Sequence, residues 1–462
     1  MSTLRPSVAA VVFLAVAVSA SVASAAYDIS ADLAKAAFWK VDSRKFVAAH
    51  AVEGFKFTSV TRESATCLRP GMVTFAGLGT YETRVFFLSA SGGVSRVEIS
   101  LYNRGDSSGK SFGDDTVGGG AGKMDKPAFA RLIRSVRAAL TAEGAKPPSP
   151  KNEPLRNAGF VQKSQTWPKT DLGTVATLTW NCYQRGGDAS TFRAEFARLV
   201  VTGPEGASAA SGARTKRSRD VKSNVTKAES GDVYIAGVPM VDQGQKGYCA
   251  AATSERVMRY YGLSIDEHEI AQAAGTSAEG GTSVASMCES VAKVAAKFRM
   301  MKSDVFGAGR QNVAWEKSDY YKVLQAYNAA ARKLRKSPIT QGQFTHGSTI
   351  DIPSMMKAMD PEVLKVAKTT KMSGQYRRFR EGVKKSVLAG QPLFWGVMLG
   401  IFSEPDIPQA SGGHMRLIIG FNEKKGDILY SDSWGAGHEM KRMPMDNAWA
   451  ITQTLFFLTP PR

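Results

Sequence analysis

The most constraining feature of this chain is Cys249, which ends the segment Asp-Gln-Gly-Gln-Lys-Gly-Tyr-Cys at positions 242–249. Two polar residues follow far along the chain: His414 opens an apolar run after two glycines, and Asp432 lies in the segment Ser-Asp-Ser-Trp-Gly. A thiol attacks a carbonyl carbon as a thiolate, so it needs a base within hydrogen-bond reach and a third group that holds the base in one tautomer. The order of these three residues therefore predicts a nucleophile, a base and an orienting acid.

The residues around the thiol predict how it is activated. A helix that starts at Cys249 and ends before Gly262 would place the sulfur at a helix N-terminus, where backbone N–H groups favour the thiolate. Gln243 precedes this helix in a loop, so its side-chain amide could donate to the oxyanion of a tetrahedral intermediate; a solvated loop amide is the alternative. The competing bases are the other histidines, none of which opens an apolar strand-like run: His50, His268, His346 and His438.

These residues resemble the papain-like cysteine peptidases, in which a Gln-Gly-x-x-Gly-x-Cys segment opens the central helix and the His and Asn-Ser-Trp-Gly segments lie on later strands. The resemblance covers about 225–462, and Arg-Tyr-Tyr-Gly at 259–262 is more similar to the bacteriocin-leader-processing branch. It implies that Cys249, His414 and Asp432 form the catalytic triad with Gln243 as oxyanion donor, and that Trp434 packs over the His–Asp pair.

Three positions depart from the papain pattern. Ala250 follows the nucleophile where papain has Trp, Lys246 replaces a nearby disulfide cysteine, and Asp432 stands where papain has Asn. Asp in that role is familiar in the leader-processing branch, so the resemblance still implies catalysis. It implies nothing about which peptide is cleaved.

The chain is long enough for two domains, and its pattern predicts where they lie. Residues 26–202 form a strand-rich α+β accessory domain or pro-domain: 85–88 and 94–102 predict a hairpin, 129–136 an amphipathic helix, and 174–180 with 193–201 a second strand pair. Residues 203–229 are rich in Gly, Ala, Ser and basic side chains and predict a linker, either a mobile spacer or a processing site.

Residues 230–462 predict the papain-like domain, with helices first and an antiparallel sheet second. Helices are expected at 249–261, 264–273, 282–298 and 321–334, and strands at 393–399, 415–421, 427–431 and 454–458. The fold class expected for the whole chain is therefore α+β.

The N-terminus and the charge bear on location and partners. Residues 1–25 predict a signal peptide, because Arg5 precedes a short apolar run and Ala-Ser-Ala follows it, so an exported chain without a later membrane span is expected. The formal net charge of +19 makes an anionic cell surface a candidate partner. Nucleic acid is not expected, because no zinc-finger spacing occurs and the basic run 332–336 is typical of a solvated helix end.

Three further cysteines decide whether the thiol is free. In an exported chain an even number of cysteines is compatible with two disulfides, which would consume the nucleophile. Cys288 lies at helical spacing among apolar residues and is expected to be a buried thiol, whereas a disulfide between Cys67 and Cys182 stays open.

Together these patterns predict an exported cysteine peptidase that acts on a polypeptide and needs no metal or organic cofactor. One alternative is an acyl or amide transferase, such as a transglutaminase-like enzyme, because an amine can resolve the same acyl-thioester. The other is a catalytically inactive protein that binds a surface.

Overall fold

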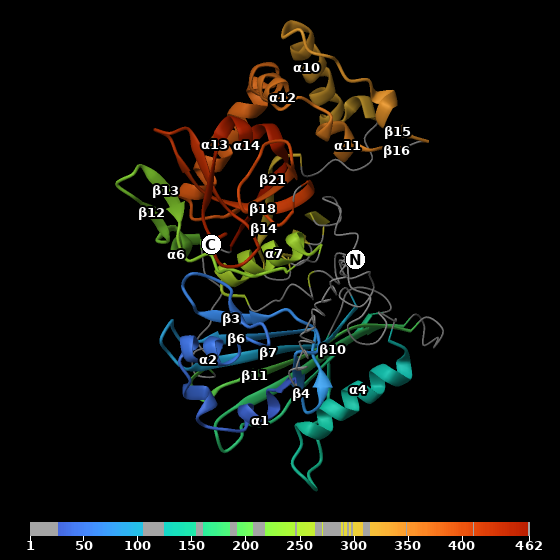
Figure 1. Ribbon diagram of the computed structural model, residues 1–462, viewed down its shortest axis with the longest axis vertical. Coiled ribbons are helices and arrows are strands. Elements are labelled where there is room, and N and C mark those ends of the chain that lie inside the picture. The colour runs from blue at the N-terminus through green and yellow to red at the C-terminus, as the bar shows by residue number, and fades with distance from the viewer. Residues whose placement is uncertain are drawn as a thin grey trace, which may run out of the picture.

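The computed structural model describes residues 26–104, 124–153, 160–184, 192–206, 218–244, 247–263, 270, 288–289, 291–292, 295–296, 299–307, 315–347, 349–409 and 411–460. The predicted signal peptide at 1–25 and the predicted helix at 264–273, apart from residue 270, lie outside these ranges, as does most of the helix predicted at 282–298. Each half of the chain has its own hydrophobic core and its own eight-stranded sheet. Figure 1 shows the two halves as separate layers of the molecule.

The N-terminal half is built on one antiparallel sheet. Its order is β2 (Lys56–Phe57), β3 (Ser64–Cys67), β6 (Glu82–Phe87), β7 (Val94–Asn103), β11 (Arg193–Thr202), β10 (Val175–Tyr183), β9 (Phe160–Thr166) and β8 (Lys151–Glu153). The smaller elements are β1 (Tyr27–Asp28), β4 (Val73–Phe75), β5 (Leu78–Gly79), α1 (Ser30–Leu33), η1 (Phe38–Lys40) and α2 (Ser43–Ala49). Both predicted strand pairs form, β6 with β7 and β10 with β11.

The predicted amphipathic helix of this half is α4 (Lys126–Ala139), which packs on β11. It begins where the Asp125 carboxylate accepts a hydrogen bond from the Ala128 N–H, because the first N–H groups of a helix have no partner within it. Phe129, Ile133 and Val136 form its buried face at helical spacing.

The C-terminal half has a sheet of order β12 (Val225–Lys227), β13 (Asp232–Ile235), β18 (Gly412–Asn422), β17 (Leu393–Leu399), β21 (Thr452–Thr459) and β14 (Met301–Phe306). Strand β19 (Asp427–Ser431) pairs with β18, and β20 (Lys441–Pro444) pairs with β19. Every residue of β17 is buried, as its continuous apolar run indicates for a strand covered on both faces.

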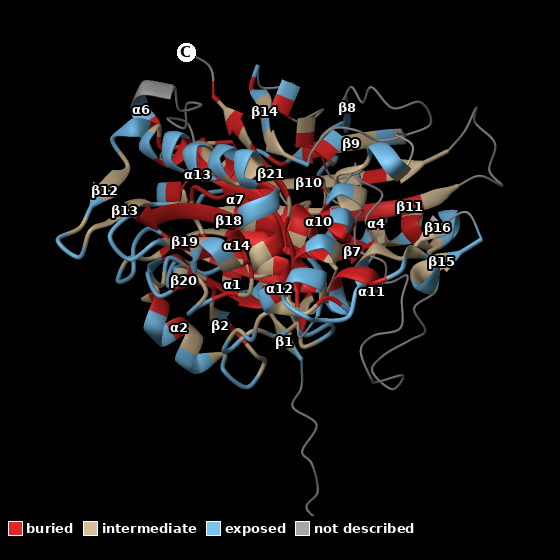
Figure 2. Cartoon of the chain, turned by 90° about the horizontal axis from the view of Figure 1, so that it is seen from above, coloured by how far each residue is buried: buried red, intermediate tan, exposed pale blue. Residues whose placement is uncertain are grey.

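Helices pack on this sheet and extend beyond it. They are α6 (Ser218–Lys222), α7 (Cys249–Tyr260), α10 (Asp319–Lys333), α11 (Ile352–Lys357), α12 (Pro361–Val366), α13 (Ser373–Leu388) and α14 (Met445–Ile451). Shorter elements are η3 (Trp315–Lys317), η4 (Gln341–Phe344), β15 (Thr345–His346), β16 (Thr349–Ile350) and a π-helical turn, η5 (Ala367–Lys371). Figure 2 shows that buried residues concentrate along β18, whereas α13 carries many exposed ones.

The fold is α+β as expected, with mixed helices and antiparallel sheets. The predicted helices at 249–261 and 321–334 appear as α7 and α10, and the four predicted strands appear as β17, β18, β19 and β21. The separation of helices from strands is less strict than expected, because β12 and β13 precede α7 and β14 precedes α10. These strands complete the sheet edges, a role that local periodicity does not reveal.

The predicted linker at 203–229 differs from the structure at its described C-terminal end. There β12 pairs with β13, and Val221 of α6 is fully buried in the C-terminal core. Residues 218–229 are therefore part of the second half rather than a spacer, because an apolar residue in a polar segment can be buried whenever neighbouring elements cover it.

Helix α7 lies where the two halves meet (Figure 1). Arg84 of β6 pairs with Glu255 of α7 at 3.0 Å, and Asn103 of β7 donates to the Tyr248 hydroxyl at 2.9 Å. The N-terminal sheet therefore packs on the helix that carries Cys249.

Two properties of the described residues bear on earlier expectations. All four cysteines have free thiols, so Cys67 and Cys182 are not paired. No helix in the described part of the chain is long and apolar enough to cross a membrane.

Candidate active site

Cys249 is the first residue of α7, as the glycine-containing segment that precedes it indicated. The residue is partly buried, and its backbone N–H is among the first in the helix, which have no partner within it. The partial positive charge of a helix N-terminus favours a negative sulfur there. The structure thus places the thiol where ionisation is assisted.

His414 and Asp432 come together at neighbouring strand ends. The antiparallel pairing of β18 with β19 sets Leu417 opposite Ser431, so His414 near the start of β18 lies close to Asp432 just after β19. His414 Nε2 is 3.0 Å from Asp432 Oδ1, and both side chains are fully buried. With Nε2 protonated toward this carboxylate, Nδ1 is the ring atom available to take a proton from a thiol.

The electrostatics of the three groups favour an ion pair between thiolate and imidazolium. Burial would raise the pKa of the Cys249 thiol, but hydrogen bonding and attraction to His414 prevail and lower it. Burial would lower the pKa of His414, yet its hydrogen bonds to Asp432 and Cys249 raise it. The other three thiols differ, because burial raises the pKa of each: Cys67, Cys182 and Cys288, the last to about 11.

Arg416 completes the acid side of the site and was not predicted from the sequence. It is buried, its Nε donates to Asp432 Oδ1 at 2.8 Å, and its Nη1 is 2.8 Å from Glu404 Oε2. Tyr430 donates its hydroxyl to the same Glu404 at 2.7 Å. Although burial opposes ionisation of Asp432, attraction to Arg416 and the hydrogen bond from His414 lower its pKa. The available signal was an arginine inside the apolar run after His414, since arginine is almost never fully buried unless it is paired.

Arg256 and Thr253 fix α7 against this sheet. Arg256, two turns beyond the nucleophile, donates from Nη1 to the Asp432 carbonyl at 2.7 Å and from Nε to the Pro239 carbonyl at 2.8 Å. Thr253 donates to the Met415 carbonyl at 3.2 Å. These bonds set the distance between the thiol on the helix and the imidazole on the strand.

Gln243 lies in a loop anchored beside the triad. Its backbone N–H donates to the Ser433 carbonyl at 2.9 Å, and its residue is 3% exposed. The loop comes so near the opposite segment that a Cβ atom at Gly435 would be 2.8 Å from Asp242 Oδ2, and Gly435 has φ +81°, so glycine is required there. Gln243 is thus held within the site rather than in solvent.

Trp434 covers the His–Asp pair. Its ring stacks on the His414 imidazole with a centroid distance of 4.2 Å and an angle of 7° between the planes. This contact agrees with the packing over the His–Asp pair that the resemblance implied for the tryptophan.

The rival histidines lie elsewhere or act differently. His50 belongs to the core of the N-terminal half and packs on Phe46 and Phe55. His346 lies in the two-residue strand β15, and His438 contributes its backbone carbonyl, which accepts from the Asp432 N–H at 3.0 Å. His268 lies outside the described residues. No cluster of three or more His, Cys, Asp or Glu side chains suited to a metal ion occurs in the part of the chain that the structure describes.

Comparisons with known proteins found a family match and similar solved structures. Residues 318–455 match the Peptidase_C39 like family, a range that includes His414 and Asp432 and begins after Cys249 and Gln243. Among solved structures, xylellain, a cysteine protease from Xylella fastidiosa, is similar at 14% identity and a TM-score of 0.25; the alignment covers 54% of this chain and 91% of xylellain. No curated protein matches the sequence. The family match confirms the resemblance to C39-like, papain-like peptidases that the motifs of the C-terminal half indicated.

Proposed function

Because the C-terminal half resembles the C39-like cysteine peptidases, we propose that this chain hydrolyses peptide bonds through Cys249, His414 and Asp432, with Gln243 as an oxyanion donor. The observation that carries the proposal is the buried His414–Asp432 contact of 3.0 Å beside a thiol whose pKa is lowered by the same imidazole. Perturbed pKa values in mutually contacting groups are typical of catalytic sites.

The reaction needs only groups of this chain and water. The Cys249 thiolate attacks the carbonyl carbon, which forms a C–S bond and moves an electron pair onto the carbonyl oxygen. The Gln243 amide and the Cys249 backbone N–H donate to this oxyanion. When the oxyanion collapses, the C–N bond breaks and the His414 imidazolium gives its proton to the leaving amine. The imidazole then takes a proton from water, whose oxygen attacks the thioester and releases the acid and the thiolate.

Arg416 and Trp434 shape this chemistry without touching the reacting atoms. Arg416 holds Asp432 ionised. The carboxylate then keeps His414 in the tautomer with its proton on Nε2, which leaves Nδ1 available to accept the proton of the thiol. Trp434 covers one face of the imidazole and reduces competition from water for the His–Asp hydrogen bond.

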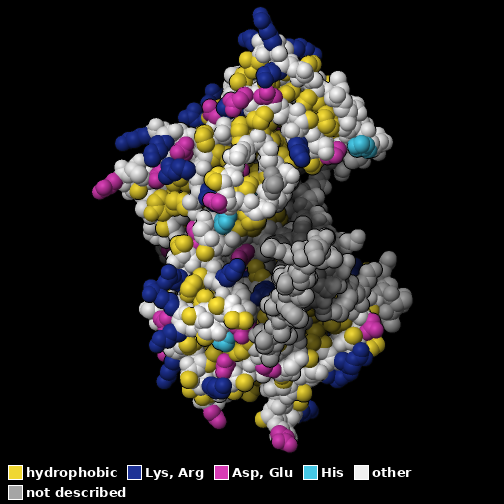
Figure 3. Space-filling model, in the orientation of Figure 1, with side chains coloured by type: hydrophobic (Ala, Val, Ile, Leu, Met, Phe, Trp, Pro, Cys, Tyr) yellow, Lys and Arg dark blue, Asp and Glu magenta, His cyan; other side chains and the backbone are white. Residues whose placement is uncertain are grey.

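The proposal extends to location and to the N-terminal half. Residues 1–25 have signal-peptide character and the chain carries a net charge of +19, so we place the peptidase outside the cytoplasm, with an anionic cell surface as a partner. On the face drawn in Figure 3, Lys and Arg side chains are spread over both halves rather than gathered in one stripe. This spread supports loose attraction to a surface and not the tracking of a nucleic acid backbone.

The decisive experiment is cleavage of a peptide library by the wild-type chain beside Cys249→Ala, with and without an excess of a small amine. Hydrolysis products from the wild type alone support the peptidase. If the products are amides of the added amine rather than carboxylic acids, the protein is a transferase. If the peptides remain unchanged, it is a binding protein.

A further inference from the structure

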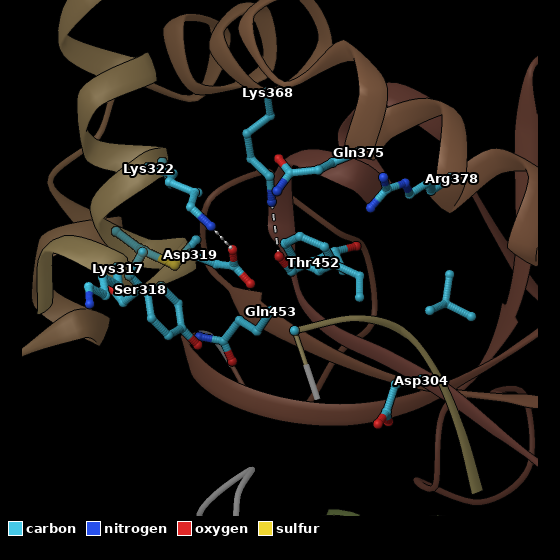
Figure 4. Close-up of a pocket in the computed structure, with 16 residues that line it drawn as sticks. Asp304, Lys317, Ser318, Asp319, Lys322, Lys368, Gln375, Arg378, Thr452 and Gln453 are labelled. Atoms are coloured by element: carbon cyan, nitrogen blue, oxygen red, sulfur yellow. Dashed lines mark hydrogen bonds and ion pairs between the residues drawn. The ribbon is translucent and has the colours of Figure 1, made fainter. Parts of the chain in front are cut away.

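A second feature of the C-terminal half is a pocket of about 520 Å³ between α10, α13, β14 and β21, which the triad does not enter. Its volume is in the range of sites that hold a side chain or a small ligand. Four cationic side chains line it, from Lys317, Lys322, Lys368 and Arg378, against two carboxylates, from Asp304 and Asp319. Figure 4 shows the Arg378 guanidinium pointing toward Lys368 and Gln375.

Both carboxylates of the pocket already have partners. Asp319 is 3.0 Å from the Lys322 ammonium, and Asp304 pairs with Lys302. Lys317, Lys368 and Arg378 form no ion pair with any described residue. The cationic side chains of the pocket therefore outnumber its carboxylates, and Asp319, which also attracts the Lys368 ammonium, is already paired with Lys322.

Lys368 makes this excess unusual. It is 1% exposed, and its ammonium donates only to two carbonyl oxygens, at 3.1 Å to Ala450 and 2.9 Å to Thr452, while it lies 4.5 Å from the Trp449 ring centroid. Burial lowers its pKa to about 7, although attraction to Asp319 acts in the opposite direction. It projects from the π-helical turn η5, an irregularity that is frequent at functional sites. A buried cation without a direct ion-pair partner is costly, and an anionic ligand would reduce that cost.

The pocket is close to the proposed active site. Val397 of β17 pairs with His414 on one side and with Thr452 on the other, so the pocket wall lies two strand spacings, about 10 Å, from the base. Gln453 also lines the pocket, and its Oε1 lies 4.0 Å from the place that a Cβ atom at Gly413 would occupy. An extended polypeptide crosses 10 Å with about three residues.

We propose that this pocket binds a carboxylate of the polypeptide substrate, about three residues from the cleaved bond, and so selects acidic substrates. The proposal rests on the peptidase function proposed above. An acidic side chain and a free C-terminal carboxylate have the same charge and geometry, so either could fill the site. Arg378, whose guanidinium points toward Lys368, would bind the anion, and Lys317 on the opposite side of the pocket would add to the attraction.

The test uses peptides in which a single Glu is moved along a neutral sequence, with Gln peptides as controls, each with an amidated or a free C-terminus. Binding is measured on the full chain carrying Cys249→Ala, and cleavage on the chain with its cysteine. The pocket variant is Lys317→Gln with Arg378→Gln, both exposed positions, and the control is Lys385→Gln, an exposed cation on α13 outside the pocket.

We expect one Glu position to bind more tightly than Gln, and the pocket variant to lose about three- to tenfold of that preference while Lys385→Gln keeps it. If amidated peptides with Glu bind more tightly than those with Gln, the pocket binds an acidic side chain. If only peptides with a free C-terminus bind tightly, the pocket binds the terminal carboxylate. Equal binding of all four kinds of peptide, Glu or Gln with an amidated or a free C-terminus, would overturn the pocket even if neutral peptides are cleaved. Selective binding without cleavage by the wild type would support the pocket and refute the peptidase.

Discussion

Arg84 and Glu255 form a buried ion pair that joins the two halves of the chain, with 3.0 Å between Arg84 Nη1 and Glu255 Oε1. Glu255 is fully buried and also contacts Arg259 at 3.0 Å, one turn along α7. The N-terminal sheet therefore supplies a counterion to the helix that carries the nucleophile. This contact favours an integral role for the N-terminal half over that of a removable plug.

We expect a chain that starts at residue 218 to unfold at a lower temperature than the full chain and to cleave peptides more slowly. Removing the first half exposes the side of α7 that packs on β6 and β7 and takes Arg84 away from Glu255. Thermal unfolding and small-peptide kinetics measure this. Faster cleavage by the short chain than by the full chain would show that the first half inhibits the peptidase. Equal rates with equal stability would show that the first half serves in targeting.

The ion pair itself is tested by a double-mutant cycle. Arg84→Met and Glu255→Gln should each lower the free energy of unfolding by about 3 kcal/mol, because each leaves a buried charge without one partner. Together they should cost less than the sum of the two, since the second change removes a charge that the first left unpaired. Strict additivity in denaturant unfolding would show that the contact carries no coupling energy.

Cys249→Ala and His414→Ala should each reduce peptide hydrolysis by about a thousandfold or more with an unchanged fold, because thiolate and base act as one unit. The matched control is Cys182→Ser, which alters a partly exposed thiol of the other half and should leave activity intact. Alkylation by a thiol reagent provides a second measurement: Cys249 should label faster than Cys288, whose pKa is about 11. Undiminished hydrolysis by either alanine variant would remove that residue from the mechanism.

Asp432→Asn should retain activity but move the alkaline limb of the pH profile of kcat/KM to lower pH. Asp432 raises the pKa of His414, and the imidazolium that protonates the leaving amine is lost as pH rises through that pKa. An amide keeps a hydrogen-bond acceptor but removes the negative charge, while Arg416 stays in place. A rate lower by about tenfold is expected. A complete loss of activity with intact folding would mean that the negative charge of Asp432 is essential. An unchanged alkaline limb would show that Asp432 does not set the pKa of His414.

The preference for acidic peptides should fall as pH rises through about 7, where Lys368 loses its charge in the free enzyme. The ratio of kcat/KM for matched Glu and Gln peptides reports this, because the ionisation of the triad cancels in the ratio. The other charged or titratable groups that line the pocket are Asp304, Lys317, Asp319, Tyr320, Lys322 and Arg378. Lys368→Arg should extend the preference to higher pH, since arginine stays protonated. A ratio independent of pH in the wild type would exclude Lys368 from substrate selection.

Local sequence determined much of the architecture of this protein. Helix α7 is predicted by the glycine-containing segment before Cys249 and the glycine after it, and the paired strands β6, β7, β10 and β11 by their alternating residues. The contact between His414 and Asp432 follows from the strands that contain or precede them. Such features depend on neighbours in the chain, which is why periodicity and motif order identify them.

Tertiary structure alone decided which charges meet. Nothing near Arg416 in the sequence indicates that it would bridge Asp432 and Glu404, and nothing near Glu255 points to Arg84. Lys368 likewise became an unpaired buried cation only when η5 packed beneath Trp449 and Thr452. The physical reason is that a buried charge is stabilised by whatever the fold brings within a few ångströms of it, and that set is defined by packing across the whole chain.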